Sequence, residues 1–162
     1  MLKAVMAEFF LKVIADYLVV PIALVGGLML VLTPKKEWPK IWGRAVVAAL
    51  TALLFAKIAS LFYQGERPFE TLGVEPGAAF LPNPGFPSDH ALLVFTITAI
   101  VWAATKNKVI ALSLLVASLL VAVGRVLALV HTPTDVIGGA VCAVLAVMLV
   151  YGRRFFTTSR RI

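Results

Sequence analysis

Three residues in the C-terminal part of the chain, Arg125, His131 and Asp135, have types and spacing suited to chemistry on phosphate. They are the only charged or imidazole side chains between Val109 and Tyr151. Ionisable groups inside such an apolar stretch are costly at membrane depth and by default mark a functional site. His131 and Asp135 are four residues apart, so a helix would let the carboxylate reach the imidazole ring.

Such a pair has a defined chemical use. A carboxylate on one ring nitrogen fixes the tautomer and leaves the other nitrogen free to attack an electrophile. The guanidinium of Arg125 is a planar cation that suits phosphate. The alternative interpretation is structural, a buried Arg–Asp pair with a packed histidine beside it. The remaining sequence favours the chemical interpretation.

The second histidine of the chain, His90, lies in the segment Pro87-Ser88-Asp89-His90. Here Pro87 ends a loop, Ser88 is suited to cap a helix, and His90 falls in the first turn. A helix start offers free backbone N–H groups and a partial positive charge, which together suit a phosphate. Asp89 is placed to interact favourably with the helix dipole. His131 likewise precedes a predicted helix start, so we expect both histidines to lie at helix starts.

The composition indicates an integral membrane protein. Of 162 residues, 61% are hydrophobic and 14% are charged, whereas roughly half of a soluble domain is apolar. The length suits a single domain, residues 1–162. The apolar runs predict an all-α polytopic membrane helix bundle with about five transmembrane spans: 17–33, 41–63, 88–105, 109–130 and 133–152. Residues 2–16 predict either an interfacial amphipathic helix or the start of a longer, tilted first span.

The basic residues predict the orientation. The formal charge of +7 comes from short loops and the tail, which is typical of a membrane protein and not of a nucleic-acid-binding surface. The basic segments 34–44, 106–108 and 153–161 fall on one side if there are five spans, and that side should be cytoplasmic. The Gly- and Pro-rich loop 64–87 and His131 would then face the extracytoplasmic side. A loop of this length is often functional.

Two further cations and a metal alternative complete the set of candidates. Arg67 opens the outer loop, and Lys57 lies deep in the second predicted span. The alternative is a zinc site, for which the ligands would be His90, His131, Asp135 and Asp89. The arginines argue against it, because cations favour an anion and can neutralise charge as a metal would. We therefore predict no metal and no other cofactor.

The pattern Arg125-x5-His131-x3-Asp135, preceded by Pro87-Ser88-Asp89-His90 and by Arg67-Pro68, resembles the three-part signature of the type 2 phosphatidic-acid phosphatase superfamily. Members are integral membrane lipid phosphatases, with soluble acid phosphatases and vanadium haloperoxidases as relatives. The resemblance extends from about Lys57 to Gly139, with the motifs in the family's order.

Two positions depart from the usual family pattern. The family places a lysine seven residues before the arginine of Arg-Pro, where this chain has Ser60; Lys57 is ten residues before. Three residues is nearly one helical turn, so Lys57 could still point to the site. Asp89 stands where the family usually has glycine. This aspartate, and more weakly Phe69, resembles the branch of bacitracin-resistance-type undecaprenyl-diphosphate phosphatases.

The resemblance implies a metal-independent reaction through a phosphohistidine. His131 would be the nucleophile, Asp135 its partner and His90 the proton donor and acceptor, while the phosphate-binding groups would be Arg67, Arg125, Ser88 and Lys57. The expected substrate is undecaprenyl diphosphate, hydrolysed to the monophosphate at the outer face. Within the class, the alternative is a phosphatase for phosphatidic acid or phosphatidylglycerophosphate. From another class, the alternative is a non-catalytic membrane component for anion binding or transport.

Overall fold

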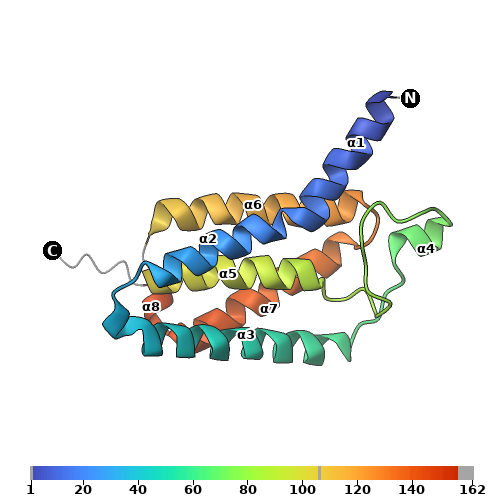
Figure 1. Ribbon diagram of the computed structural model, residues 1–162. Helices are drawn as coiled ribbons and strands as arrows, with labels where there is room; N and C mark the ends of the chain where they lie inside the picture. Colours follow the sequence, from blue (N-terminus) through green and yellow to red (C-terminus); the bar gives the residue numbers. More distant parts are fainter. Residues whose placement is uncertain (1, 106, 157–162) are drawn as a thin grey trace.

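The computed structural model describes residues 2–105 and 107–156, and every regular element in that part of the chain is helical. This confirms the predicted all-α membrane bundle (Figure 1). In chain order the elements are α1 (Leu2–Lys12), the π-helical turn η1 (Val13–Tyr17), α2 (Val19–Val31), the 3-10 turn η2 (Lys35–Glu37), α3 (Trp38–Ser60), α4 (Pro68–Leu72), α5 (Asp89–Thr105), α6 (Lys108–Leu127), α7 (Pro133–Tyr151) and α8 (Arg153–Phe156).

Most of these helices are suited to a bilayer. The segments long and apolar enough to cross are Val5–Val31, Lys35–Ser60, Lys108–Leu127 and Pro133–Tyr151. Helix α5 is also apolar but has only 17 residues. It packs against α2, α3, α6 and α7, and most of its residues are buried. The predicted third span is therefore the central helix of the bundle, and the others surround it.

The N-terminal segment is one nearly continuous helix. Helix α1, the π turn and α2 follow one another with no loop between them, and α1 projects away from the bundle (Figure 1). The apolar part, Val5–Val31, has 27 residues, which is about 40 Å of helix against a hydrocarbon thickness of roughly 30 Å. Of the two alternatives for residues 2–16, the continuous helix favours the longer first span by its length and composition.

The turn between α6 and α7 differs from the prediction. The fourth span was expected to reach Val130, but α6 ends at Leu127. Leu129 has a φ of 60°, a left-handed conformation that is uncommon for a bulky residue and that ends the helix. The carbonyls that the helix no longer uses accept N–H groups of the outer loop. Phe69 N–H donates to Leu129 O, and Gly77 N–H to Ala128 O, each at 3.0 Å.

Small residues bring the helices that carry the site close together. The buried residues of α3 recur every three or four positions and are all alanine: Ala45, Ala48, Ala52 and Ala56. Close helix packing in membranes commonly uses such residues. At Gly139 of α7, a Cβ atom would lie 2.7 Å from the carbonyl oxygen of Ser88. This glycine therefore lets the start of α7 approach the start of α5.

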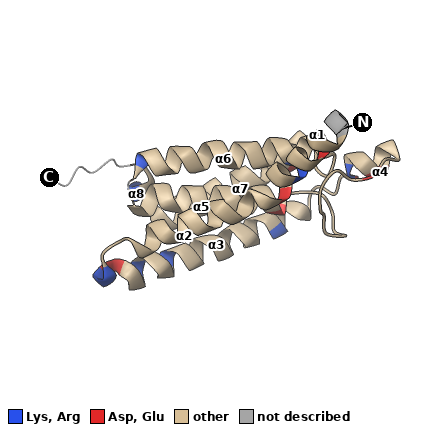
Figure 2. Ribbon diagram, turned by 45° about the horizontal axis from the view of Figure 1, so that its top comes forward, with Lys and Arg blue, Asp and Glu red and all other residues tan. Residues whose placement is uncertain are grey.

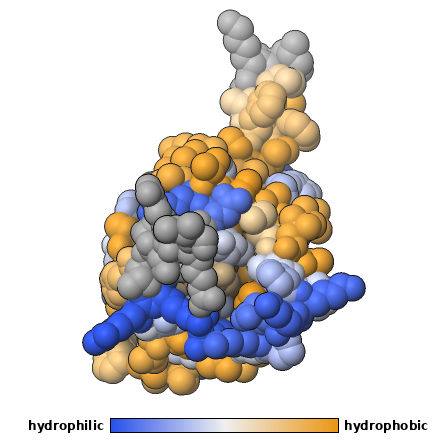
Figure 3. Space-filling view, turned by 90° about the vertical axis from the view of Figure 1, so that its left-hand side faces the viewer, coloured by the Kyte–Doolittle hydropathy of each residue, from blue (hydrophilic) through white to orange (hydrophobic). Residues whose placement is uncertain are grey.

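Charge divides the bundle into two unlike ends. Figure 2 shows Lys and Arg gathered where α2 meets α3 and where α8 lies, while most acidic residues lie near α1, α4 and the start of α5. Figure 3, which faces the first of these ends, shows hydrophilic residues there beside apolar surface. The candidate site lies at the opposite end, where α5 and α7 begin.

Candidate active site

A cavity of about 160 Å³ lies where α5 begins and α6 ends. It is lined by Arg67, Ala79, Phe80, Leu81, Asp89, His90, Arg125 and His131. The two histidines and two arginines proposed from sequence come from four separate segments of the chain. The fold brings all four to this one cavity.

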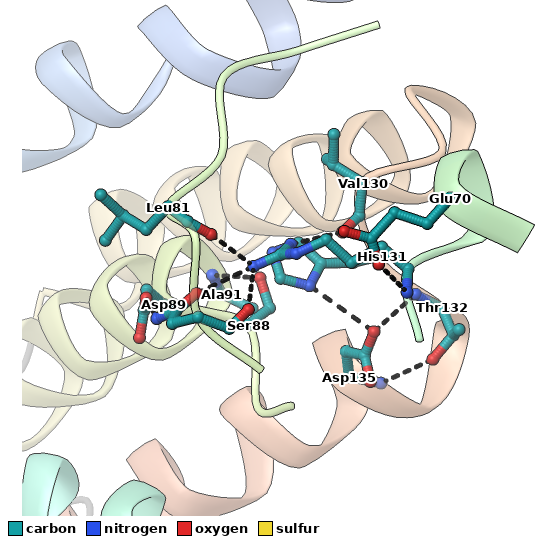
Figure 4. Close-up of polar contacts among 11 residues, drawn as sticks. Glu70, Leu81, Ser88, Asp89, Ala91, Val130, His131, Thr132 and Asp135 are labelled. Atoms are coloured by element: carbon teal, nitrogen blue, oxygen red, sulfur yellow. Dashed lines mark hydrogen bonds and ion pairs between the residues drawn. The ribbon is translucent and has the colours of Figure 1, made fainter. Parts of the chain in front are cut away.

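The helix start of α7 orients His131. Thr132 caps this helix, its hydroxyl accepting the N–H of Asp135 at 3.3 Å, and the Asp135 carboxylate accepts the N–H of Thr132 at 2.7 Å. The same Oδ2 atom lies 3.5 Å from His131 Nδ1 (Figure 4). That separation is long for a hydrogen bond, but it places the carboxylate next to this ring nitrogen. With Nδ1 facing the carboxylate, Nε2 is the ring nitrogen left for substrate.

The start of α5 supplies the second histidine. His90 is half-buried and lines the cavity, whereas Asp89 is exposed and accepts a 3.4 Å hydrogen bond from the side-chain amide of Asn83. Ser88 is fully buried. Its hydroxyl caps α5 by accepting the N–H of Ala91 at 3.5 Å, and its own N–H donates to the carbonyl of Asp135 at 3.0 Å. Ser88 thus joins α5 to α7 and is not among the residues that line the cavity.

Arg67 forms hydrogen bonds that hold the outer loop against the site. Its guanidinium donates to Val130 O at 2.7 Å, to Leu81 O at 3.1 Å, and to the backbone and side-chain oxygens of Asn83 at 3.2 and 2.9 Å. The residue is 4% exposed. Burial lowers the pKa of Arg67 from its ordinary value, and the nearby Glu70 carboxylate opposes that shift. Arg67 therefore lines the cavity and also hydrogen-bonds the loop residues Leu81 and Asn83 beside it.

Arg125 is held by a residue that the sequence motifs do not contain. It is 1% exposed, and its Nη1 donates to Asp16 Oδ1 at 2.6 Å. Its Nε is buried and has no hydrogen-bond partner. Asp16 lies in the π turn of the first span, which the sequence analysis assigned to a helix without a role in the site. An acidic residue in an apolar span was the available signal.

Lys57 lies outside this cavity. It is exposed and lines a neighbouring cavity of about 280 Å³, together with Ser60, Gln64 and Asn83. Asp89 lines both cavities. The offset lysine is therefore next to the site but separated from the histidines and arginines.

Residues 2–105 and 107–156 contain no group of three or more His, Cys, Asp or Glu side chains arranged to hold a metal ion. The zinc alternative thus has no ligand set in that part of the chain. The cavity has two arginine side chains in its lining. Such a donor set suits an anion with several oxygens, such as a phosphoryl group.

Comparison with known proteins agrees with the motifs. Residues 40–158 match the PAP2 superfamily. One curated relative, the bacitracin transport permease protein BcrC of Bacillus licheniformis, is 32% identical over 108 residues, which is 66% of this chain and 52% of that protein. The chain thus matches about half the length of this relative. No solved structure gives a significant match. The superfamily match covers most of the chain, including both histidines and both arginines of the cavity, so the chain belongs to the PAP2 superfamily.

Proposed function

We propose that this multi-pass membrane protein is a lipid phosphatase that works through a phosphohistidine, and that it hydrolyses undecaprenyl diphosphate to the monophosphate at the extracytoplasmic face. The observation that carries the proposal is the single cavity that joins an oriented histidine, a second histidine and two buried arginines. Membership of the PAP2 superfamily supports phosphatase chemistry in general.

In the first step, His131 Nε2 attacks the terminal phosphorus in line with the bond to the leaving oxygen. The N–P bond forms as the P–O bond breaks, and His90 gives a proton to the leaving lipid phosphate. Asp135 stabilises the charge that develops on the imidazole ring. Arg125 and Arg67 stabilise the equatorial oxygens, over which the negative charge is spread.

In the second step, His90 removes a proton from water, and the resulting oxygen attacks phosphorus. The N–P bond breaks, inorganic phosphate leaves, and both histidines return to their starting states. Each proton and each bond is accounted for by the two histidines and water, so the step needs no other co-reactant. The arginines supply the charge stabilisation.

An apolar cavity beside the site supports a lipid substrate. It has a volume of about 740 Å³, lies between α5, α6 and α7, and all its lining residues are apolar. The lining includes Leu127 at the end of α6 and Pro133 at the start of α7, two residues after His131. A lipid chain lying there would place its phosphate near the nucleophile.

Two other functions are alternatives to this proposal. A phosphatase for phosphatidic acid or phosphatidylglycerophosphate would use the same cavity with a different lipid. A non-catalytic component for anion binding or transport is favoured only by the name of the relative, a transport permease protein. An anion binder does not require a histidine oriented by a carboxylate with a second histidine beside it, so we favour catalysis.

The test is phosphate release by purified protein from a panel of lipid phosphates, with excess chelator present. We expect polyprenyl diphosphate to be hydrolysed and chelation to leave the rate unchanged, because guanidinium groups do the work that a metal would do. Rapid quench with labelled substrate should trap phosphate on His131. Absence of phosphate release from every lipid would favour the binding or transport alternative. Full dependence on added zinc would overturn the mechanism.

A further inference from the structure

Asp16 connects three separate parts of the molecule at the candidate site. Its Oδ1 accepts from Arg125 Nη1 at 2.6 Å, and its Oδ2 accepts the backbone N–H of Ala79 at 2.9 Å. Its side chain is 11% exposed. The first span, α6 and the outer loop therefore meet on one carboxylate. Asp16 lies outside the segment that matches the superfamily, which begins at residue 40.

Local structure places Asp16 there. A π turn, Val13–Tyr17, interrupts the first span at this residue, and such turns are frequent at functional sites. On the facing helix, Gly124 precedes Arg125. A Cβ at Gly124 would lie 3.0 Å from Ile14 Cγ2 and 3.1 Å from Ala15 N. The glycine therefore allows the π turn to lie directly on α6, within reach of the arginine.

We propose that Asp16 is a positioning residue for the reaction described above. By binding Nη1, it holds the Arg125 guanidinium so that the remaining donors, including the unpartnered Nε, face the phosphoryl oxygens. It also offsets the cost of burying the arginine charge. If the Asp16 carboxylate instead competed with phosphate for Arg125, removing the carboxylate would tighten the binding of a phosphoryl mimic.

The test compares Asp16→Ala and Asp16→Asn with Glu8→Gln, a change at an exposed carboxylate of the same span. Two quantities are measured: kcat/KM for a polyprenyl diphosphate and the affinity for orthovanadate, a phosphoryl mimic. We expect Asp16→Ala to lower kcat/KM by about 10- to 100-fold and to weaken vanadate binding. Asp16→Asn should lie between it and the wild type, because one acceptor oxygen remains. Glu8→Gln should match the wild type.

A double variant separates positioning from a merely structural role. In an Arg125→Lys background, Asp16→Ala should cause little further loss, because the residue acts through the guanidinium. An undiminished loss in that background, or tighter vanadate binding in Asp16→Ala, would overturn the proposal. If wild-type protein hydrolysed no lipid but its vanadate affinity still depended on Asp16, the proposed function would fail and the positioning role would stand.

An independent observation lies at the opposite end of the bundle. A cavity of about 200 Å³ there is lined by Thr33, Pro34, Glu37, Lys40, Ile41, Arg44, Ala104, Thr105, Tyr151 and Arg154. Tyr151 is 5% exposed, and its hydroxyl has no hydrogen-bond partner; neither has the buried Nη1 of Arg44. Buried polar groups are normally hydrogen-bonded. Two unpartnered donors therefore point to a ligand that accepts from both.

We infer that this cavity binds the phosphate-bearing headgroup of an anionic lipid. Three cationic residues line it against one carboxylate, Glu37, so the lining favours an anion. The guanidinium of Arg44 lies 5.9 Å from the centre of the Tyr151 ring, which keeps the two donors together. Figure 3 shows this end as a hydrophilic region beside apolar surface, the boundary where headgroups lie.

Thermal unfolding of the purified protein in micelles tests this inference. Phosphatidylglycerol should raise Tm by several degrees over phosphatidylcholine, and inorganic phosphate at equal concentration should do less. Arg44→Gln and Tyr151→Phe should reduce the lipid effect. Lys36→Gln should not, because Lys36 is an exposed lysine of η2 that does not line the cavity. An equal effect of inorganic phosphate would show that free phosphate is the ligand. Equal reduction by Lys36→Gln, or no lipid effect, would overturn the site.

Discussion

In the proposed mechanism, Asp135 serves both the fold and the reaction. Its Oδ2 atom accepts the Thr132 N–H at 2.7 Å and lies 3.5 Å from His131 Nδ1. The carboxylate thus fixes the helix start and the imidazole ring with the same oxygen. A histidine placed immediately before a capped helix has little freedom to turn away from the cavity.

We expect His131→Ala to abolish turnover, because in the proposed mechanism His131 forms the covalent intermediate. Asp135→Asn should keep the fold but lose most activity, since an amide does not stabilise a charged imidazole as a carboxylate does. Loss of the capping contact should lower the free energy of unfolding by no more than about 2 kcal/mol. Steady-state kinetics and denaturant unfolding measure both effects. Thr134→Ala, at an exposed position in the same turn, is the control; wild-type turnover in His131→Ala would refute the assignment.

Lys57 should contribute less than either arginine. It is exposed and lines the neighbouring cavity, whereas Arg67 and Arg125 are buried and line the cavity with the histidines. We expect Lys57→Ala to lower kcat/KM several-fold at most, and alanine at either arginine to lower it by at least about 100-fold. The comparison is made with one lipid diphosphate. A loss in Lys57→Ala equal to that in Arg125→Ala would show that the lysine reaches the phosphate during turnover.

At the scale of residues, the sequence predicted the residues of the motifs but not the residue that holds Arg125 in place. His90, His131, Arg67 and Arg125 were identified by type and spacing, and they line one cavity. Asp16 was not identified, because it pairs with a residue 109 positions away. Such a contact depends on how helices pack, which a local pattern does not contain.

The helices were largely predictable because long apolar runs specify spans. Their ends were less so. The prediction carried the fourth span to Val130, whereas the left-handed Leu129 ends α6 at Leu127. No glycine, asparagine or proline at these positions indicated the turn. The loop contacts with Ala128 and Leu129 stabilise it instead, and these are tertiary contacts.

Close approach of α5 and α7 makes Gly139 sensitive to substitution. A Cβ there would lie 2.7 Å from Ser88 O and 3.0 Å from Leu92 N, both backbone atoms that cannot move alone. Gly139→Ala should therefore lower the free energy of unfolding by about 1–3 kcal/mol and reduce activity, because it separates His131 from His90. Detergent-denaturation curves and kinetics measure the two effects.

Gly27→Ala is the matched control for this prediction. Gly27 lies within α2, and a Cβ there would meet no atom within 4 Å. Because alanine favours helix over glycine, this change should raise the free energy of unfolding by up to about 1 kcal/mol. If Gly139→Ala were as stable and active as Gly27→Ala, the contact between the two helix starts would determine neither stability nor activity.

At the scale of the whole molecule, the charge asymmetry predicts the orientation in the membrane. Most basic residues lie at the end opposite the site (Figure 2), and basic loops normally stay in the cytoplasm. The test labels single introduced cysteines in intact cells with a membrane-impermeant maleimide. The native Cys142 is buried, so background labelling of this residue should be low. Glu75→Cys, in the outer loop, should be labelled, and Lys36→Cys only after lysis. The reverse pattern would invert the topology.

In the proposed function, the apolar cavity between α5, α6 and α7 binds the tail of the substrate. Binding energy from a part of the substrate that does not react can raise turnover when it orients the phosphate. We therefore expect polyprenyl diphosphate to give a higher kcat/KM than phosphatidic acid, and a tail-free diphosphate to be a poor substrate. Competition assays in detergent measure the order. Preference for phosphatidic acid would contradict the proposed substrate.

A bulky residue in the cavity tests whether the tail lies there. Ile137 of α7 lines it and is 61% exposed, whereas Leu149 of the same helix is 68% exposed and is not among the lining residues. Ile137→Trp should raise KM for the polyprenyl substrate several-fold, because the indole takes up space that the tail needs. It should leave the slow hydrolysis of the tail-free diphosphate unchanged, since that molecule does not reach the cavity. Leu149→Trp should affect neither substrate. If Ile137→Trp changed the kinetics of both substrates equally, the substitution would act on the phosphate site. If the kinetics with the polyprenyl substrate stayed as in the wild type, the tail would lie elsewhere.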